Sequence, residues 1–218
     1  MRQSAIDMSS ELSGEELAGL RALLKLAGLS GPHLEIGTAA GGTLKELMLC
    51  YSPPRPRFVV VDPFKYFPDQ KRIVETNLRS AGIDPAEVDL REAFSGDALA
   101  AAHAAGERYD FIFIDANHEA RHVIRDLRWA QLLSPGRYLC LHDYQPNFPG
   151  VVWAVDRFLD RNRHYRRSAQ HGALVVIEKL ADSGGDKVGA ADFLLGDLLS
   201  QSHRLRRSVR KRFGRLKA

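Results

Sequence analysis

The chain has 218 residues, of which 44% are hydrophobic and 27% are charged, and its formal net charge is +4 at pH 7. This length and composition are typical of one well-cored globular domain and exclude a mainly disordered or fibrous protein. No apolar run is long enough to cross a membrane, and the first residues lack the apolar core of a signal peptide. We therefore expect a cytoplasmic protein, and two cysteines without metal-type spacing fit a reducing compartment.

A helix is predicted first, followed by alternating strands and helices. Ser13 and Glu16 match a capping box, and apolar residues then recur at helical spacing over 14–27. Strands are predicted near 33–37, 58–62, 89–94, 110–115, 137–142 and 173–179. Helices are predicted near 42–51, 69–81, 96–105, 119–133 and 150–162. This alternation indicates βαβ units, and right-handed crossovers make the parallel sheet doubly wound.

The last strand is predicted to be antiparallel. The segment between Tyr165–Arg167 and the strand at 173–179 is too short for a crossover helix, so the two should form a hairpin. The predicted fold class is therefore α/β, with a doubly wound, mostly parallel seven-stranded sheet that has an antiparallel C-terminal strand. We expect this domain to occupy residues 1–180.

The first strand ends in a glycine-rich turn. Glu35, Gly37 and Gly41 form the pattern E-x-G-x-x-x-G, which differs from the G-x-G-x-x-G of dinucleotide sites. Glycines let the backbone approach a ligand, whereas an acid at this place would repel a pyrophosphate and suits a cationic amino group. Asp62 ends the second strand, where a carboxylate is well placed to bind ribose hydroxyls.

Polar residues also follow the buried strand at 110–115. Asp115 and His118 come directly after four apolar residues in a row, at the edge where open α/β sheets hold their ligands. A carboxylate for a metal or ligand, with a base three residues later, would make this a reaction centre. The alternative is a strand end that simply meets water.

The positive charge lies at the C-terminal end of the chain. Arg204 to Lys217 contain eight Lys or Arg and no acid, and subtracting these eight from +4 leaves −4 for the remainder. After a linker at 181–188 we expect a basic amphipathic helix at 189–218, whose apolar stripe comprises Leu195, Leu198, Leu205, Val209, Phe213 and Leu216. Such a helix would contact an anionic membrane surface, making the protein peripheral there, or a second subunit in a homo-oligomer. Nucleic acid is a less suitable partner because the body is acidic.

Taken together, these motifs resemble the class I S-adenosylmethionine-dependent methyltransferases. The resemblance implies a Rossmann-like fold with S-adenosylmethionine as cofactor. It implies that the cofactor is bound by Glu35, Gly37, Thr38, Gly41, Asp62, Ser95, Asp97 and Asp115. Of these, Ser95 and Asp97 would approach the adenine, although a polar turn capping the helix at 96–105 explains them nearly as well.

Residues 113–118, 126–129, 134–136 and 141–144 are similar to small metal-dependent O-methyltransferases of the macrocin (sugar) and catechol type. The resemblance implies catalytic roles for Asp115, His118 and Asp143, with His118 as general base, and metal ligands at Asp115, His142 and Asp143. The metal would be Mg²⁺ or Mn²⁺. The sequence departs from the pattern at His142, where an acid or amide is usual. Either the metal differs, or His142 turns away from it.

We therefore expect an O-methyltransferase that acts on a hydroxyl of a sugar-containing small molecule or glycan precursor. One alternative is a metal-independent methyltransferase of another small molecule, in which Asp143 orients His118. A second is a non-catalytic accessory protein of glycan assembly that keeps the cofactor fold. A nicotinamide oxidoreductase is disfavoured because the pyrophosphate motif is missing.

Overall fold

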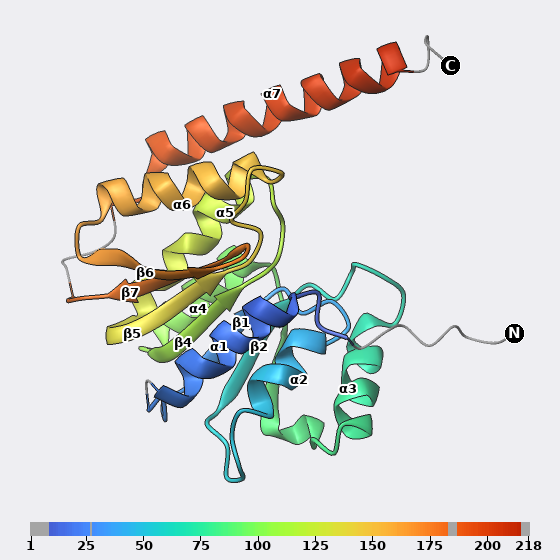
Figure 1. Ribbon diagram of the computed structural model, residues 1–218, viewed down its shortest axis with the longest axis vertical. Helices are drawn as coiled ribbons and strands as arrows, with labels where there is room; N and C mark the ends of the chain where they lie inside the picture. The colour runs from blue at the N-terminus through green and yellow to red at the C-terminus, as the bar shows by residue number, and fades with distance from the viewer. Residues whose placement is uncertain (1–8, 27, 183–186, 215–218) are drawn as a thin grey trace, which may run out of the picture.

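Seven strands form one sheet at the centre of the molecule. The computed structural model describes residues 9–26, 28–182 and 187–214, with side chains as far as Arg204 (Figure 1). The strands are β1 (His33–Ile36), β2 (Phe58–Asp62), β3 (Val88–Glu92), β4 (Tyr109–Ile114), β5 (Leu133–Leu141), β6 (Tyr165–His171) and β7 (Leu174–Lys179). Their order is β3-β2-β1-β4-β5-β7-β6; β7 pairs antiparallel with both β5 and β6, and the other pairs are parallel. The predicted fold class, including the hairpin, is confirmed.

Helices cover both faces of this sheet, which is why its central strands are apolar at consecutive positions. One face holds α1 (Gly14–Leu26), α2 (Gly42–Met48) and α3 (Gln70–Ser80), and the other holds α4 (Ser95–Ala104), α5 (Ala120–Asp126) and α6 (Pro149–Arg161). A short 3₁₀ helix, η1 (Pro85–Glu87), precedes β3. Val60 of β2 packs with the first set, whereas Val59 and Val61 pack with the second.

The predicted helix at 119–133 is wrong in its second half. The α-helix α5 ends at Asp126, and a 3₁₀ helix, η2 (Leu127–Leu132), follows. The tighter winding of a 3₁₀ helix is frequent at helix ends, and here it leads directly into β5. It also buries Trp129 completely.

The predicted strand at 137–142 begins and ends too late. β5 starts at Leu133 and ends at Leu141. Leu133 pairs with Tyr109 and Tyr138 with Phe111, so the intervening residues form an irregularity in the ladder, where Gly136 has a φ of 71°. Position 142 therefore lies outside the strand, which matters for the site.

The N-terminal helix begins as predicted. The Ser13 N–H donates to the Glu16 carboxylate at 2.7 Å, and the Glu16 N–H donates to the Ser13 hydroxyl at 3.3 Å, so the capping box is confirmed. Leu20 and Leu24 are buried against the sheet. The last residue of the predicted range, residue 27, lies outside the described part of the chain.

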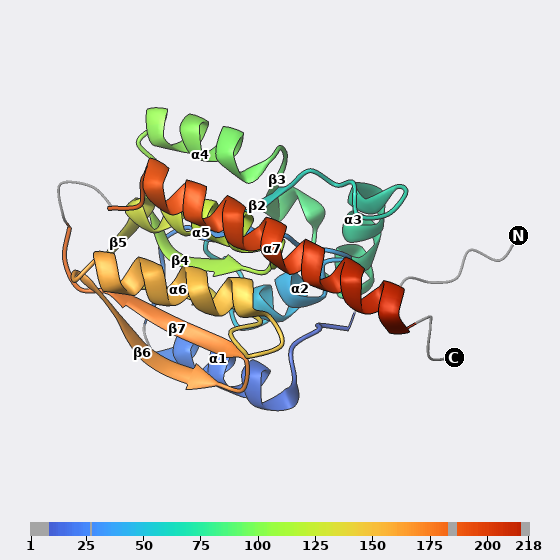
Figure 2. The ribbon, with the colours of Figure 1, turned by 90° about the horizontal axis from the view of Figure 1, so that it is seen from above.

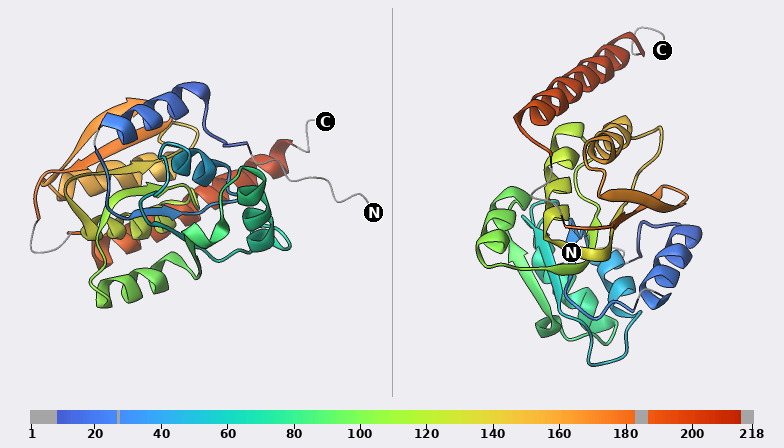
Figure 3. Two further views of the ribbon diagram at one scale, coloured as in Figure 1. Left: turned by 90° about the horizontal axis from the view of Figure 1, so that it is seen from below. Right: turned by 90° about the vertical axis from the view of Figure 1, so that its left-hand side faces the viewer.

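The C-terminal helix α7 (Ala190–Gly214) forms an additional layer over α5 and α6 (Figures 1 and 2). Figure 3 shows its far end running past the body of the domain. Residues 183–186 of the predicted linker and residues 215–218 of the predicted helix lie outside the described residues. Among the described helices, none combines the length and the apolar character needed to cross a bilayer.

The order of the strands reverses between β1 and β4, and Gly37 lets their ends meet. Gly37 follows β1 with a φ of 81°, and a Cβ there would lie 2.4 Å from the Asp115 carbonyl oxygen. Any other residue would force the two strand ends apart. Open α/β sheets bind their ligands at such a reversal, beyond the carboxyl ends of the strands.

We expect Gly37→Ala to lower the free energy of unfolding by about 2–4 kcal/mol, because it adds both backbone strain and an overlap with Asp115. Gly82→Ala is the matched control, since Gly82 has a φ of 74° but open space around its Cα. It should cost about 1 kcal/mol. Urea unfolding measures the free energy of unfolding of both variants. Equal losses of stability would show that the close approach of Asp115 does not require glycine at position 37.

Candidate functional site

Four polar side chains from two neighbouring strands gather at the carboxyl edge of the sheet. Asp115 and His118 follow β4, and His142 and Asp143 follow β5, its parallel neighbour. Atoms of Asp115, His142 and Asp143 that can bind a metal all lie within 4.8 Å of one another. The structure thus brings together the four residues that the sequence analysis assigned to catalysis and metal binding.

A tight turn after β5 lets His142 and Asp143 face the same site. Adjacent residues within a strand point to opposite faces, but β5 has ended at Leu141. Asp143 then adopts a φ of 60°, a left-handed conformation that Asp tolerates better than most residues. Strain of this kind is concentrated at functional sites.

His142 is directed toward the two carboxylates, so the alternative in which it turns away does not describe this arrangement. Its Nδ1 lies 3.4 Å from Asp115 Oδ2 and 3.7 Å from Asp143 Oδ2. Nδ1 is buried and has no hydrogen-bond partner among the described residues, which is costly unless a ligand supplies one. Two carboxylates and an imidazole fit a divalent cation, and imidazole suits Mn²⁺, Fe²⁺, Ni²⁺ or Zn²⁺ better than Mg²⁺.

His118 contacts the same carboxylates from the solvent side. Its Nε2 lies 2.8 Å from Asp143 Oδ2 and 3.9 Å from Asp115 Oδ1. Asp115 and Asp143 raise the pKa of His118 to about 9, although partial burial opposes the shift. Burial also opposes protonation of His142, but Asp115 and Asp143 outweigh it and raise its pKa. Both imidazoles therefore balance the two carboxylates while no other cation is bound.

Glu16 is a site residue that the sequence analysis missed. Besides capping α1, its carboxylate accepts a hydrogen bond from the Ala173 N–H at 2.7 Å and lies 3.6 Å from His142 Nε2. Burial disfavours the charged form, but the N–H groups of Ser13 and Ala173 hold the pKa of Glu16 below its usual value. The capping box already explained Glu16, so no sequence signal pointed to the site.

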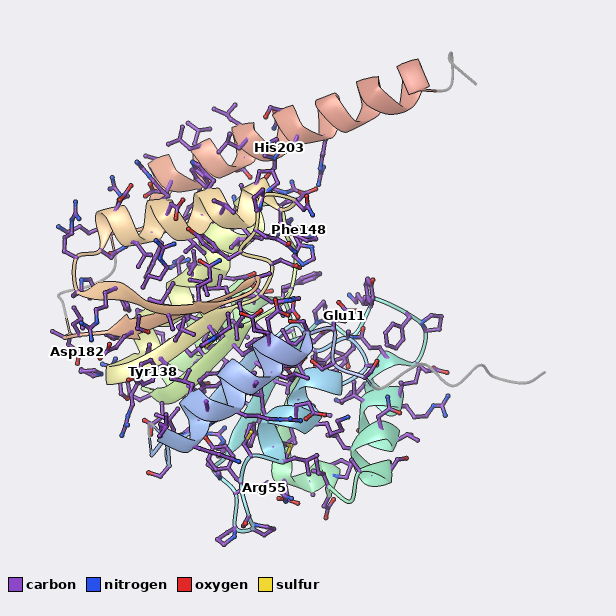
Figure 4. The ribbon with its side chains drawn as sticks, viewed as in Figure 1. Glu11, Arg55, Tyr138, Phe148, Asp182 and His203 are labelled. Atoms are coloured by element: carbon purple, nitrogen blue, oxygen red, sulfur yellow. The ribbon has the colours of Figure 1, made fainter. Side chains whose placement is uncertain are left out.

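A cleft of about 730 Å³ opens beside the cluster. It is lined by His118, His142 and Asp143, by the segment that leads into α1, and by Tyr144 and Phe148 from the loop before α6. Figure 4 labels two lining residues, Glu11 and Phe148, from these two segments. The Phe148 ring packs 4.6 Å from that of His118. A small molecule of sugar size can therefore reach His118.

Gly150 brings the start of α6 against the segment that carries His118. A Cβ at Gly150 would lie 2.5 Å from the His118 carbonyl oxygen and 2.7 Å from the Ala120 nitrogen. Asn117 accepts a hydrogen bond from the Glu119 N–H at 2.9 Å and so fixes the turn into α5. These contacts hold the backbone of His118 in place.

Glu35 is fully buried near the end of β1, and neither of its carboxylate oxygens has a hydrogen-bond partner among the described residues. Burial, together with the nearby charges of Asp115 and Asp62, raises its pKa to about 8. A buried carboxyl group without partners is the feature that a cationic amino group would complete. This fits the expected cofactor, whose methionine part carries such a group.

The Asp62 carboxylate accepts hydrogen bonds from two backbone N–H groups. One oxygen accepts from the Thr38 N–H at 3.0 Å and the other from the Phe64 N–H at 2.6 Å. Each carboxylate oxygen can accept a second hydrogen bond, so Asp62 can still accept hydrogen bonds from ribose hydroxyls, as predicted. Gln70, which the sequence analysis did not single out, donates to the Ala39 carbonyl at 3.0 Å and holds the turn that contains Thr38 and Gly41.

Ser95 and Asp97 have different surroundings. The Ser95 hydroxyl accepts a hydrogen bond from Trp129 Nε1 at 2.9 Å, whereas Asp97 is exposed. α4 begins at Ser95, and its N-cap residue is Phe94, which has no side-chain capping bond. The capping explanation for these two residues is therefore wrong. Their predicted approach to the adenine stays a prediction.

We expect Glu35→Gln to stabilise the protein, and more so as the pH rises. The folded-state pKa of about 8 exceeds the ordinary pKa of 4.5 that the unfolded chain has, so stability is lost as the pH rises through that interval. The gain should be about 2–5 kcal/mol at pH 8 and below about 1 kcal/mol at pH 5. Thermal unfolding at both pH values measures it, with the exposed Glu92→Gln as control. A gain that does not change with pH would show that Glu35 is charged and satisfied in the folded state.

We expect Asp115→Asn and Asp143→Asn each to weaken Mn²⁺ binding by about tenfold or more, because each removes a charged ligand. The exposed Asp160→Asn on α6 should leave binding unchanged. Electron paramagnetic resonance of free Mn²⁺ measures the affinity directly, without any turnover. If the first two variants bind as the wild type does, the three-residue metal site is wrong and the metal-independent alternative gains support.

Comparison with known proteins places this geometry in a family. Residues 34–144 match the profile of a family described as a methyltransferase domain. The matched segment runs from β1 to just beyond Asp143 and contains every predicted site residue. A search of curated proteins returned no match.

Solved structures share the fold. An O-methyltransferase from Bacillus cereus, solved with SAH, superposes with a TM-score of 0.62 and 20% identity, over 77% of this chain and 81% of that one. TomG from Streptomyces achromogenes, an O-methyltransferase involved in tomaymycin synthesis, gives 0.61 and 18%, over 78% and 82%. CalS11, a TDP-rhamnose 3'-O-methyltransferase of calicheamicin biosynthesis, gives 0.59 and 16%, over 75% and 78%. At these identities the likeness concerns the fold.

Proposed function

Because the chain belongs to the methyltransferase domain family and has the class I fold, we propose that it transfers a methyl group to a hydroxyl of a sugar-containing small molecule or glycan precursor. Membership in the family confirms the predicted resemblance and with it the methyltransferase class, whose cofactor is S-adenosylmethionine. The observation that carries the finer proposal is the convergence of Asp115, His118 and Asp143 beside an open cleft.

Methyl transfer to oxygen requires an acceptor that has lost its proton and that lies in line with the sulfonium methyl group. The sulfur–methyl bond breaks as the oxygen–methyl bond forms, and S-adenosylhomocysteine leaves. His118 is the proposed acceptor of the hydroxyl proton, since its Nε2 faces the cleft and Asp143 orients the ring at 2.8 Å. Tyr144 and Phe148 offer aromatic faces on which a sugar ring can pack.

Asp115 and Asp143 raise the pKa of His118 to about 9, so these two carboxylates by themselves would keep its imidazole protonated. It can act as a base only when another positive charge balances these carboxylates. A divalent cation held by Asp115, His142 and Asp143 would supply this charge and would lower the pKa of a coordinated hydroxyl. The residues of the site therefore support metal dependence more directly than the metal-independent alternative.

Sugar as the acceptor class rests on two supports. The sequence around the cluster resembles the sugar-modifying group, and CalS11, which shares the fold, is named for methylating TDP-rhamnose. The accessory-protein alternative would leave Asp115, His118 and Asp143 without a role. We expect no nicotinamide chemistry, because the acidic Glu35 at the end of β1 would repel a pyrophosphate bound at the turn that follows.

We expect His118→Ala to lower turnover by about a hundredfold or more while cofactor binding is unchanged, because a general base contributes to the transition state and not to cofactor affinity. His122→Ala, which changes a partly exposed histidine four residues later in the first turn of α5, is the matched control. Release of S-adenosylhomocysteine from S-adenosylmethionine is measured with TDP-rhamnose and with catechol as acceptors, in Mg²⁺, in Mn²⁺ and in chelator. Calorimetry with S-adenosylhomocysteine and NAD measures binding separately.

The outcomes separate the candidates. Release with TDP-rhamnose supports a sugar acceptor, whereas release with catechol alone supports another small molecule. An accessory protein would bind the cofactor without releasing product, and His118→Ala would change nothing. If S-adenosylhomocysteine fails to bind under every metal condition, the proposed function is wrong.

A further inference from the structure

The C-terminal helix α7 has two halves of opposite charge. Residues 190–203 contain Asp192 and Asp197 and no Lys or Arg, whereas the residues from Arg204 onward contain eight basic residues and no acid. The acidic half is docked on the domain by ion pairs. Asp192 lies 2.7 Å from Arg157, and Asp197 lies 3.1 Å from Arg125.

The fully buried residues on the face of α7 that contacts the domain are small or polar, and the partly buried Phe193 packs beside them against the domain core. Asp192, Gly196 and Ser200 recur every four residues and are buried. The Arg121 N–H donates to the Ser200 hydroxyl at 3.1 Å. A Cβ at Gly196 would lie 3.1 Å from the Arg121 Cα, so the two helices approach closely there. None of the leucines in the described part of α7 is therefore fully buried by its contact with the domain.

The leucines lie on the opposite side and remain in solvent. Leu194 is 61% exposed, Leu195 42% and Leu198 53%. They make up three of the eight large apolar side chains that are exposed in the described part of the chain, and they lie within five residues of one another. In the sequence, the apolar positions then continue at helical spacing through 205, 209 and 213, with basic residues between them.

We propose that α7 lies along an anionic lipid surface, with its leucine side in the interface and its basic residues against the lipid headgroups. Exposed apolar residues that are followed, at helical spacing, by a segment rich in Lys and Arg are the pattern of helices that lie on a membrane without crossing it. A second copy of the helix is a poorer occupant, because two segments with eight like charges each would repel. Nucleic acid would satisfy the basic residues and leave the leucines in water.

The acidic half of α7, which is docked on the domain, determines which side of the domain would face the lipid surface. Arg204, the last residue with a described side chain, binds both oxygens of Glu119 at 2.8 Å. Glu119 directly follows His118, so α7 reaches the segment that carries the proposed base. Lipid binding is nevertheless independent of methyl transfer, and its test needs no acceptor.

The test is sedimentation of the full chain with vesicles of phosphatidylcholine, with and without phosphatidylglycerol. We expect partitioning onto the anionic vesicles to be about tenfold stronger, and to weaken in high salt. The triple variant L194S/L195S/L198S should lose about fivefold or more of this binding. The matched control L26S/L49S/L180S changes three leucines that are exposed elsewhere, and it should bind as the wild type does. Unchanged affinity for S-adenosylhomocysteine, or an unchanged circular dichroism spectrum if the cofactor does not bind, shows that both variants are folded.

Four results would overturn the proposal. The first is equal binding to the two kinds of vesicle, and the second is equal binding by the two triple variants. The third is a lipid-free dimer, seen by sedimentation velocity, that L194S/L195S/L198S dissociates, since a second copy would then cover the leucines. If a DNA oligonucleotide displaces the protein from the vesicles while the leucine variant binds lipid normally, nucleic acid is the partner.

Discussion

Negative charge is concentrated at the carboxyl edge of the sheet, and the protein supplies few cations to balance it. Asp62 is stabilised by two backbone N–H groups, and Asp115 and Asp143 share two imidazoles. Glu35 has no partner among the described residues and is held in its neutral form by burial. Because desolvated carboxylates are costly when unpaired, the site is complete only with ligands that bring positive charge. A sulfonium cofactor with an amino group, and a dication, are ligands of this kind.

The sequence was sufficient for the fold because its strongest signals are local. Consecutive apolar residues in β2 and β4 have one explanation in an α/β protein, a strand covered on both sides. The polar residues after β4 then had to lie at the ligand-binding edge, where the structure places Asp115 and His118, whereas Asp143 after β5 was implied by the family resemblance. Boundaries were less predictable where the backbone departs from regular geometry, as in the 3₁₀ helix that replaces the second half of the helix at 119–133.

Features that depend on distant parts of the chain could not be predicted. The left-handed backbone of Asp143 lets two adjacent side chains share a site, and nothing in the local sequence marks it. The Ser95 hydroxyl is bound by Trp129, 34 residues away. The eight Lys and Arg residues dominate the sequence of α7, and nothing in that pattern showed that Asp192 and Asp197 of its first half form the ion pairs that dock the helix.

Glu16 also has a consequence for the order in which the protein is assembled. Its carboxylate accepts a hydrogen bond from the backbone N–H of Ala173, 157 residues later in the chain, and also lies beside the His142 ring. At the usual rate of synthesis, about 5–20 residues per second, roughly 10–30 s pass between these two ends of the contact. The part of the cleft wall that α1 forms can therefore be completed only after the β6–β7 hairpin has been synthesised. A nascent chain can form the first strands and their glycine turn well before it has a complete place for an acceptor.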